Sequence, residues 1–296
     1  MRDVFSTYHP IVNFSFFLAA LGFSMSFMHP VCLGISLVCA LCYSGYLLRG
    51  KALRFNLIYM LPLLILTVTL NPLFNHQGAT ILMYLRSGNP LTLESILFGI
   101  SAAVMLITVI TWFSCFNKII TSDKFVYLFG RIIPALSLVL SMTMRFVPHF
   151  KAQMKRISLA QRYIGKDVSN GGLLSRAKNG IRILSVMVTW ALENAVETAD
   201  SMKSRGYGLK GRTAFSIYRF DRRDRLMLAF IVLCAGYIIS GAVMGALYFR
   251  YYPTVRGNVS GFYSVSVYTV YFALCISPVV INLREDIKWK SLTSKI

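Results

Sequence analysis

The sequence has few acidic residues and few charged residues of either sign. Of its 296 residues, 11 are Asp or Glu, against 31 Lys or Arg, and charged side chains together make up 14%. Hydrophobic residues make up 56%, and the mean hydropathy is +0.60. A soluble domain typically carries about 25% charged residues. The composition therefore predicts a polytopic membrane protein rather than a soluble fold with one core.

Histidine is also scarce, and the four histidines show no metal-ligand spacing such as H-x-x-x-H. The six cysteines lie in apolar segments, where a thiol behaves as a small hydrophobic group, and this includes the C-x-x-C of Cys39 and Cys42. No Ser/His/Asp or Cys/His grouping is present. We therefore expect no metal site, no cofactor and no catalytic residue.

Long uncharged runs identify the membrane spans. Residues between Val4 and Leu48 include no charged side chain, a run too long for one span of about 20 residues. The triplet Met28-His29-Pro30 divides it. No cleavage-type site follows the first apolar stretch, so we expect that stretch to remain in the mature protein. Six spans are predicted near 11–27, 31–48, 55–70, 95–116, 226–249 and 263–283.

The basic residues fall mainly on one side of this topology. With both termini in the cytoplasm, 28 Lys and Arg lie inside and only Arg86, Arg250 and Arg256 lie outside, as the positive-inside rule requires. The net charge of +20 is then explained without nucleic acid, which we do not expect as a partner. We expect a multi-pass protein of a bacterial cell (plasma) membrane, in contact with the lipid bilayer.

The stretch 145–225 is the most basic part of the chain, with 17 Lys and Arg against six acids. It contains two helix-like runs, 149–165 and 190–208, each closing on a glycine. The apolar runs 132–148 and 183–192 are interrupted or too short to span, so we assign them to long helices at the cytoplasmic interface. The predicted fold is all-α, with six membrane helices and two long cytoplasmic helices. The predicted regions are 1–131 with four spans, 132–224 with the cytoplasmic helices, and 225–296 with two spans and the tail.

The segment GYGLKGRT (206–213) fits G-x-G-x-x-G, and it nearly fits a phosphate loop, with Arg212 in place of the lysine. Both nucleotide motifs require a strand before the glycines and a helix after them. A predicted helix precedes these glycines. The segment therefore indicates a glycine-rich helix terminus with positive φ angles.

Three acids recur on one face of the second cytoplasmic helix, at Glu193, Glu197 and Asp200. They form either a solvated face or a cation site. A different face carries Ala191, Ala195 and Ala199, whose spacing allows close helix packing. This stripe serves either ordinary core packing or a crossing with the first cytoplasmic helix, whose apolar face is Phe150, Met154, Ile157 and Ile164.

The run ADSMKSRGYGLKGRT (199–213) resembles the transmembrane (T) component of energy-coupling factor (ECF) transporters, the EcfT/CbiQ family, which includes permease subunits of cobalt and nickel uptake systems. The family carries an x-Arg-x motif at the end of each of two cytoplasmic coupling helices. Ser204-Arg205-Gly206 matches the second motif. NPLFNHQG (71–78) and His9-Pro10 are also similar to the family.

The first motif departs from the family pattern A-Q-x-x-R-G-x-D. Ala160, Gln161, Gly165 and Asp167 fit, but Ile164 stands at the arginine position, and Arg162 lies two residues earlier. The resemblance therefore implies ATPase-coupling roles for Ser204, Arg205 and Gly206, with Arg162 as a candidate replacement for the missing arginine.

The resemblance implies a coupling subunit that is not itself an enzyme. It would transmit the motion of two ABC ATPase subunits, which hydrolyse ATP, to a substrate-binding membrane S subunit for vitamin or metal-ion uptake. Helix and S-subunit contacts are expected at Ala191, Ala195, Ala199, Met154 and Ile157. The alternatives are a stand-alone secondary transporter that uses Glu193, Glu197 and Asp200 as a cation site, and a membrane enzyme. The substrate stays open, because in this family the S subunit selects it.

Overall fold

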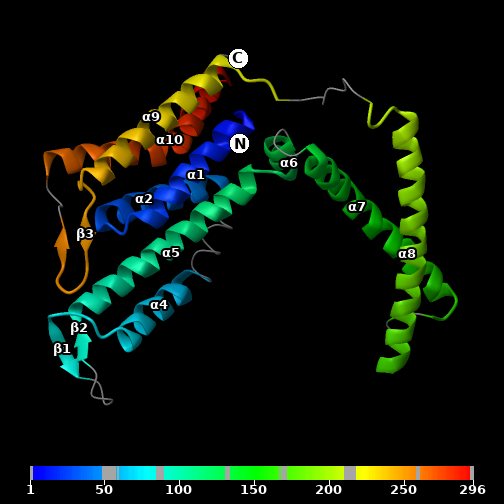
Figure 1. The fold of residues 1–296 in the computed structure, drawn as a ribbon, viewed down its shortest axis with the longest axis horizontal. Coiled ribbons are helices and arrows are strands. Elements are labelled where there is room, and N and C mark those ends of the chain that lie inside the picture. The colour runs from blue at the N-terminus through cyan, green and yellow to red at the C-terminus, as the bar shows by residue number, and fades with distance from the viewer. Residues whose placement is uncertain are drawn as a thin grey trace. The chain divides into compact units, whose positions relative to one another are not determined.

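The computed structural model describes residues 3–48, 58, 60–84, 90–130, 134–166, 168, 172–209, 218–257 and 261–293 (Figure 1). The chain forms two compact units. Unit 1 comprises residues 1–124 and 218–296, and unit 2 comprises residues 125–217. Helices dominate both units, and the only strands in the described residues are four short ones in unit 1. The predicted all-α membrane fold is confirmed.

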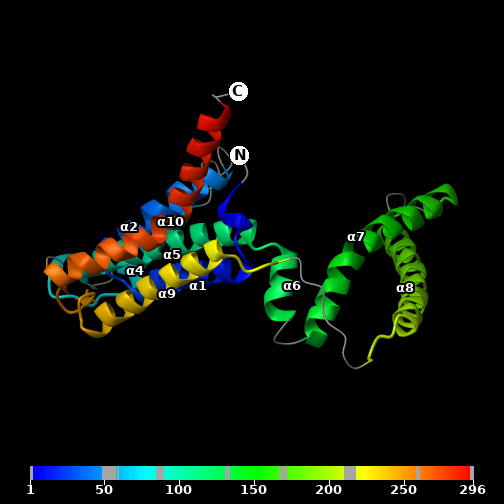
Figure 2. The ribbon, with the colours of Figure 1, turned by 90° about the horizontal axis from the view of Figure 1, so that it is seen from above.

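Unit 1 combines the N-terminal and C-terminal parts of the chain. Figure 2 shows its helices packed side by side, with α2 in contact with α5 and α10, and α9 in contact with α10. Two antiparallel hairpins, β1–β2 and β3–β4, lie among the helix connections. Its elements are η1 (Phe5–Thr7), α1 (Pro10–Ser26), α2 (Pro30–Leu48), α4 (Leu61–Phe74), β1 (Ile81–Tyr84), β2 (Pro90–Thr92), α5 (Leu93–Ile119), α9 (Arg222–Val243), β3 (Phe249–Arg250), β4 (Arg256–Gly257) and α10 (Phe262–Thr293).

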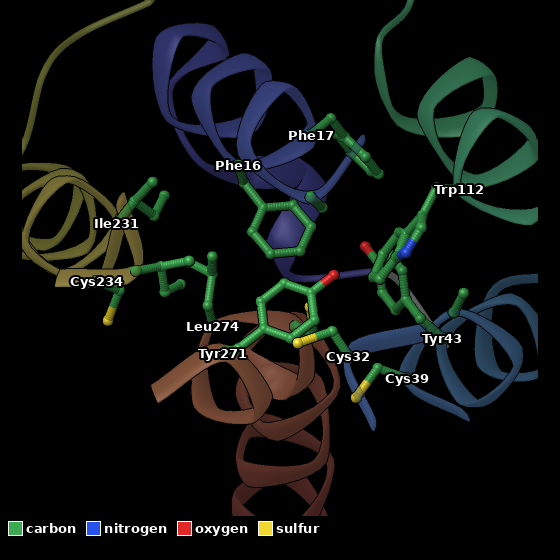
Figure 3. Close-up of a cluster of buried hydrophobic side chains, with 14 of the residues drawn as sticks. Phe16, Phe17, Cys32, Cys39, Tyr43, Trp112, Ile231, Cys234, Tyr271 and Leu274 are labelled. Carbon is green, nitrogen blue, oxygen red and sulfur yellow. The ribbon is translucent and has the colours of Figure 1, made fainter. Parts of the chain in front are cut away.

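Large aromatic side chains from several helices fill the core of unit 1 (Figure 3). Phe16 of α1 meets Trp112 of α5 with ring centroids 5.7 Å apart in an edge-to-face arrangement. The Trp112 indole N–H donates to Ser36 Oγ at 3.0 Å, and the Ser24 hydroxyl lies 2.6 Å from Ser36 Oγ. The buried polar atoms of these three side chains are therefore hydrogen-bonded, as a stable core requires.

Each of the six predicted spans contains an apolar helix. Four of the described helices are long and apolar enough to cross a membrane, namely Pro30–Leu47, Leu93–Ile119, Arg222–Val243 and Phe262–Leu292, whereas Pro10–Ser26 and Leu61–Phe74 are shorter. The chain is a multi-pass membrane protein. The predicted span 55–70 is shifted, since α4 ends at Phe74, and residues 55–57 and 59 lie outside the described residues.

Two helices in the C-terminal part differ in extent from the spans predicted there. Helix α9 ends at Val243 instead of continuing to 249, because Gly245 has a φ of +77° and closes the helix with main-chain hydrogen bonds. Helix α10 continues to Thr293, ten residues beyond the predicted end of the span at 283, because no glycine or proline interrupts the charged tail there.

Unit 2 contains two long helices, α7 (Pro134–Tyr163) and α8 (Leu173–Ser204). Helix α6 (Ser122–Gly130) leads into this unit and crosses the boundary between Lys124 and Phe125. The predicted run 149–165 is the second half of α7, which continues through Pro148. Likewise 190–208 is the second half of α8 and its terminus. Each run is therefore part of one longer helix, as predicted.

Candidate functional site: the ends of two crossed helices

Helices α7 and α8 cross and pack through a small apolar cluster (Figure 1). Ile157 of α7 packs with Ile183 and Met187 of α8, and Trp190 borders the cluster. The Trp190 ring also meets the ring of Phe150 with centroids 5.5 Å apart. The α8 residues are spaced by four and then three positions, so they lie on one helical face. That face holds the two helices together.

Beyond the cluster, the middle of α7 and the second half of α8 border a groove of about 860 Å³. The groove mixes charged, aromatic and hydroxyl side chains, and it extends to the end of α8. Its lining includes Arg145, Phe146 and His149 of α7 and Glu197, Ser201 and Arg205 of α8.

The end of α7 is a Schellman motif. The Lys166 N–H donates to Gln161 O at 2.9 Å, and the Gly165 N–H donates to Arg162 O at 3.0 Å. Gly165 has a φ of +76°, a conformation that glycine adopts without steric cost. Ile164 is therefore the C-cap residue, and its side chain is 64% exposed.

The end of α8 repeats the same arrangement. The Tyr207 N–H donates to Met202 O at 3.0 Å, and the Gly206 N–H donates to Lys203 O at 2.9 Å. Gly206 has a φ of +76°, and Gly208 has a φ of +92°. Arg205 is the C-cap residue, and its side chain is exposed. The prediction of positive-φ glycines at this terminus is confirmed, whereas residues 210–213 of the motif lie outside the described part of the chain.

The two motifs align residue by residue. Ile164 takes the place of Arg205, and Arg162 takes the place of Lys203, so Arg162 does not occupy the C-cap position of the first tip. Both Arg162 and Ser204 are exposed. Helix α9 ends in the same way at Gly245, so the backbone motif is a general helix stop. The end of α8 differs from the other two because its C-cap residue is Arg205, which carries a guanidinium.

Helix α8 carries two further faces besides the one against α7. Glu193, Glu197 and Asp200 are all exposed, and of these Glu197 borders the groove. No group of three potential metal ligands occurs among the described residues.

The alanine stripe forms the third face. Ala191 is half-buried, and Ala195 and Ala199 are exposed. They lie beside Leu192 and Val196, which are 65% and 63% exposed, in a continuous apolar strip. Met154 of α7 is exposed, whereas Ile157 is buried in the contact between the helices. The described packing of α7 on α8 therefore uses Ile183, Met187 and Trp190, and it leaves Ala195 and Ala199 accessible.

The family-like segment NPLFNHQG lies in unit 1, where it packs on the start of α5. The Ser95 hydroxyl donates to Asn75 O at 2.7 Å, and the Thr92 hydroxyl donates to Gln77 O at 3.1 Å. A Cβ at Gly78 would lie 2.7 Å from the Cβ of Thr92, so this close approach requires glycine. The segment thus fixes the connection between α4 and α5.

Comparison with known proteins shows which family this chain matches. Residues 9–217 match the family of cobalt transport proteins (CbiQ), so the match covers most of the chain. Several curated proteins are similar to shorter parts of it. One is the energy-coupling factor transporter transmembrane protein EcfT of Lactobacillus helveticus, 36% identical over 105 residues, which are 35% of this chain and 38% of that protein.

The EcfT of Bacillus selenitireducens is 34% identical over 111 residues, which are 37% of this chain and 41% of that protein. The chain thus spans about two fifths of the length of these relatives. The predicted membership of the EcfT/CbiQ family is confirmed. With its multi-pass membrane unit and its pair of glycine-capped helices, this chain belongs to the family of cobalt transport proteins.

Proposed function

We propose that this chain is the transmembrane coupling subunit of an ECF-type ABC importer, in which the ends of α7 and α8 each contact one ABC ATPase subunit. The observation that carries the proposal is the pair of matching tips, with Arg205 exposed at the C-cap of α8. A guanidinium forms bidentate, charge-assisted hydrogen bonds with carboxylates, so an acidic groove on an ATPase suits it. Arg205 also interacts favourably with the C-terminal end of the helix dipole, which stabilises α8 itself.

The exposed strip on α8 supports the second half of the proposal, contact with a substrate-binding S subunit. Ala195, Ala199, Leu192 and Val196 form a strip of small and apolar side chains beside the α7 contact. Small residues let a second membrane helix approach closely. Movement of α8 at its tip would then reach the S subunit through this strip. Vitamins and cobalt or nickel ions are the candidate substrates, and hydrolysis of ATP belongs to the partners.

The orientation follows from charge. Both termini and unit 2 lie on the cytoplasmic side, because nearly all Lys and Arg residues are then inside. This orientation places the tips where cytoplasmic ATPases can reach them.

The test is charge reversal at the tip in the assembled complex. The tagged chain is co-expressed with ABC ATPase and S subunits that co-purify with it, and uptake of radiolabelled Co²⁺, Ni²⁺ and vitamins is measured. Arg205→Glu should abolish uptake and weaken ATPase binding by at least about 30-fold, since loss of one partner of a buried charge pair costs roughly 2–5 kcal/mol. The protein should still reach the membrane.

Lys203→Glu is the matched control, because Lys203 is also exposed in the last turn of α8 but is not the C-cap residue. It should change ATPase binding much less. Ile164→Arg supplies the guanidinium that the first tip lacks and should tighten ATPase binding. Normal uptake by Arg205→Glu would refute the proposal. Ion-driven uptake by the purified chain alone would instead support a cation site at Glu193, Glu197 and Asp200.

A further inference from the structure

The N-terminal residues 3–13 contact three separate parts of unit 1, and we call this segment the N-terminal clasp. Its main-chain N–H groups at Val4 and Phe5 donate to Asn282 Oδ1 of α10, at 2.9 and 3.1 Å. The Asn282 amide in turn donates to the Asp3 carboxylate. These contacts fix the clasp to the last helix of the chain.

The second contact of the clasp is with Lys124 of α6. The Lys124 ammonium donates to Ser6 O, and the side chain is only 7% exposed. With its amide oriented as its partners require, Asn13 accepts from Lys124 Nζ at 2.9 Å and donates to Phe5 O at 2.9 Å. Burial lowers the pKa of Lys124, and the nearby Asp3 carboxylate opposes that shift. A buried ammonium is costly without such acceptors, so they hold α6 in place.

The third contact is with the segment that leads into α9. The main-chain N–H of His9 donates to Asp224 Oδ1 at 3.0 Å. The imidazole ring of His9 meets the Phe220 ring with centroids 4.9 Å apart. The Arg223 guanidinium lies 4.4 Å from the centroid of the Tyr8 ring, within cation–π range.

These contacts coincide with the two points at which the chain passes between the units. Lys124 is the last residue of unit 1 before the first passage, and unit 1 resumes at Tyr218 after the second, two residues before Phe220. We propose that the N-terminal clasp anchors both connections to unit 2, so that movement of α7 and α8 is transmitted to unit 1. Without the clasp, α6 and residues 218–221 would shift when α7 and α8 move, and the movement would not reach the rest of unit 1. This inference rests on the proposed coupling function, and it makes Lys124, Asp224 and Arg223 positioning residues.

The test compares transport with ATP hydrolysis in the complete complex, reconstituted in liposomes. Lys124→Met keeps the length of the side chain but removes the ammonium. ATPase co-purification and ATP hydrolysis should stay close to the wild-type values, while uptake of radiolabelled Co²⁺, Ni²⁺ or vitamin falls roughly ten-fold, as expected for loss of a charged hydrogen bond. Amide hydrogen exchange in α6 should accelerate. Lys118→Met is the matched control, since Lys118 is exposed at the end of α5. This variant should change neither the uptake nor the hydrogen exchange in α6.

An unchanged ratio of uptake to hydrolysis in Lys124→Met would overturn the inference. If that variant does not accumulate in the membrane, Arg223→Met provides the same test at an exposed position, with exposed Arg222→Met as its control. Arg223→Met should lower the ratio about two-fold, as a weak cation–π contact implies, and an unchanged ratio contradicts the clasp. The proposed function is tested separately, because Arg205→Glu acts on ATPase binding and Lys124→Met does not.

Discussion

Unit 1 and unit 2 are stabilised to very different degrees by their own packing. Trp112, Phe16 and Tyr271 are fully buried in unit 1, within a cluster that draws on five helices. In the described residues of unit 2, the buried cluster consists of Ile157, Ile183 and Met187. Unit 1 therefore specifies its own arrangement, whereas α7 and α8 leave most of their apolar surface available to other molecules.

The largest expected effect is on the core of unit 1. Trp112→Ala should lower the free energy of unfolding by about 3–5 kcal/mol, because it creates a cavity and removes the hydrogen bond to Ser36. Thermal unfolding of the purified protein in detergent measures it. Phe113→Ala, one position along α5 where the side chain is 46% exposed, should change the midpoint far less. Equal changes for both variants would show that the buried aromatic core does not determine the stability of unit 1.

A smaller effect is expected at the contact between α7 and α8. Ile183→Ala should cost about 2 kcal/mol, at the low end for a buried isoleucine, because few neighbours surround it. Hydrogen exchange should accelerate in α7 and α8 but stay unchanged in α1, α2 and α5. Ile181→Ala, at a 69% exposed position on the same helix, is the control. Faster exchange throughout unit 1 would show that the two units unfold together.

The smallest effect is expected at the helix stops. Alanine at a positive-φ position costs about 1 kcal/mol, so Gly206→Ala and Gly245→Ala should each lower stability slightly. Only Gly206→Ala should also weaken ATPase co-purification, because it shifts the backbone beside Arg205. Similar losses of ATPase binding in both variants would indicate a general folding defect instead.

The sequence predicted the spans and the helix stops because their causes are local. Uncharged runs identify the spans, and Gly165 and Gly206 mark two helix ends. The same signal was present at Gly245, but the apolar residues around it favoured a longer span than the structure has.

Contacts between distant segments could not be predicted in this way. Helix α8 has two apolar faces, and periodicity identifies both without showing which one packs on α7. The roles of Lys124 and Asp224 were also missed. Their partners in the N-terminal clasp lie more than a hundred positions away. From the sequence alone, Lys124 is one of the cytoplasmic basic residues and Asp224 is an acid near the start of a predicted helix.

The Schellman motif has a consequence for how the two tips can diverge. Its hydrogen bonds join main-chain atoms, and the positive φ belongs to the glycine, so the side chain at the C-cap is not needed to hold the loop. Isoleucine at one tip and arginine at the other therefore share one scaffold. Each helix tip can change its side-chain chemistry by a single codon while the backbone geometry that presents it stays the same.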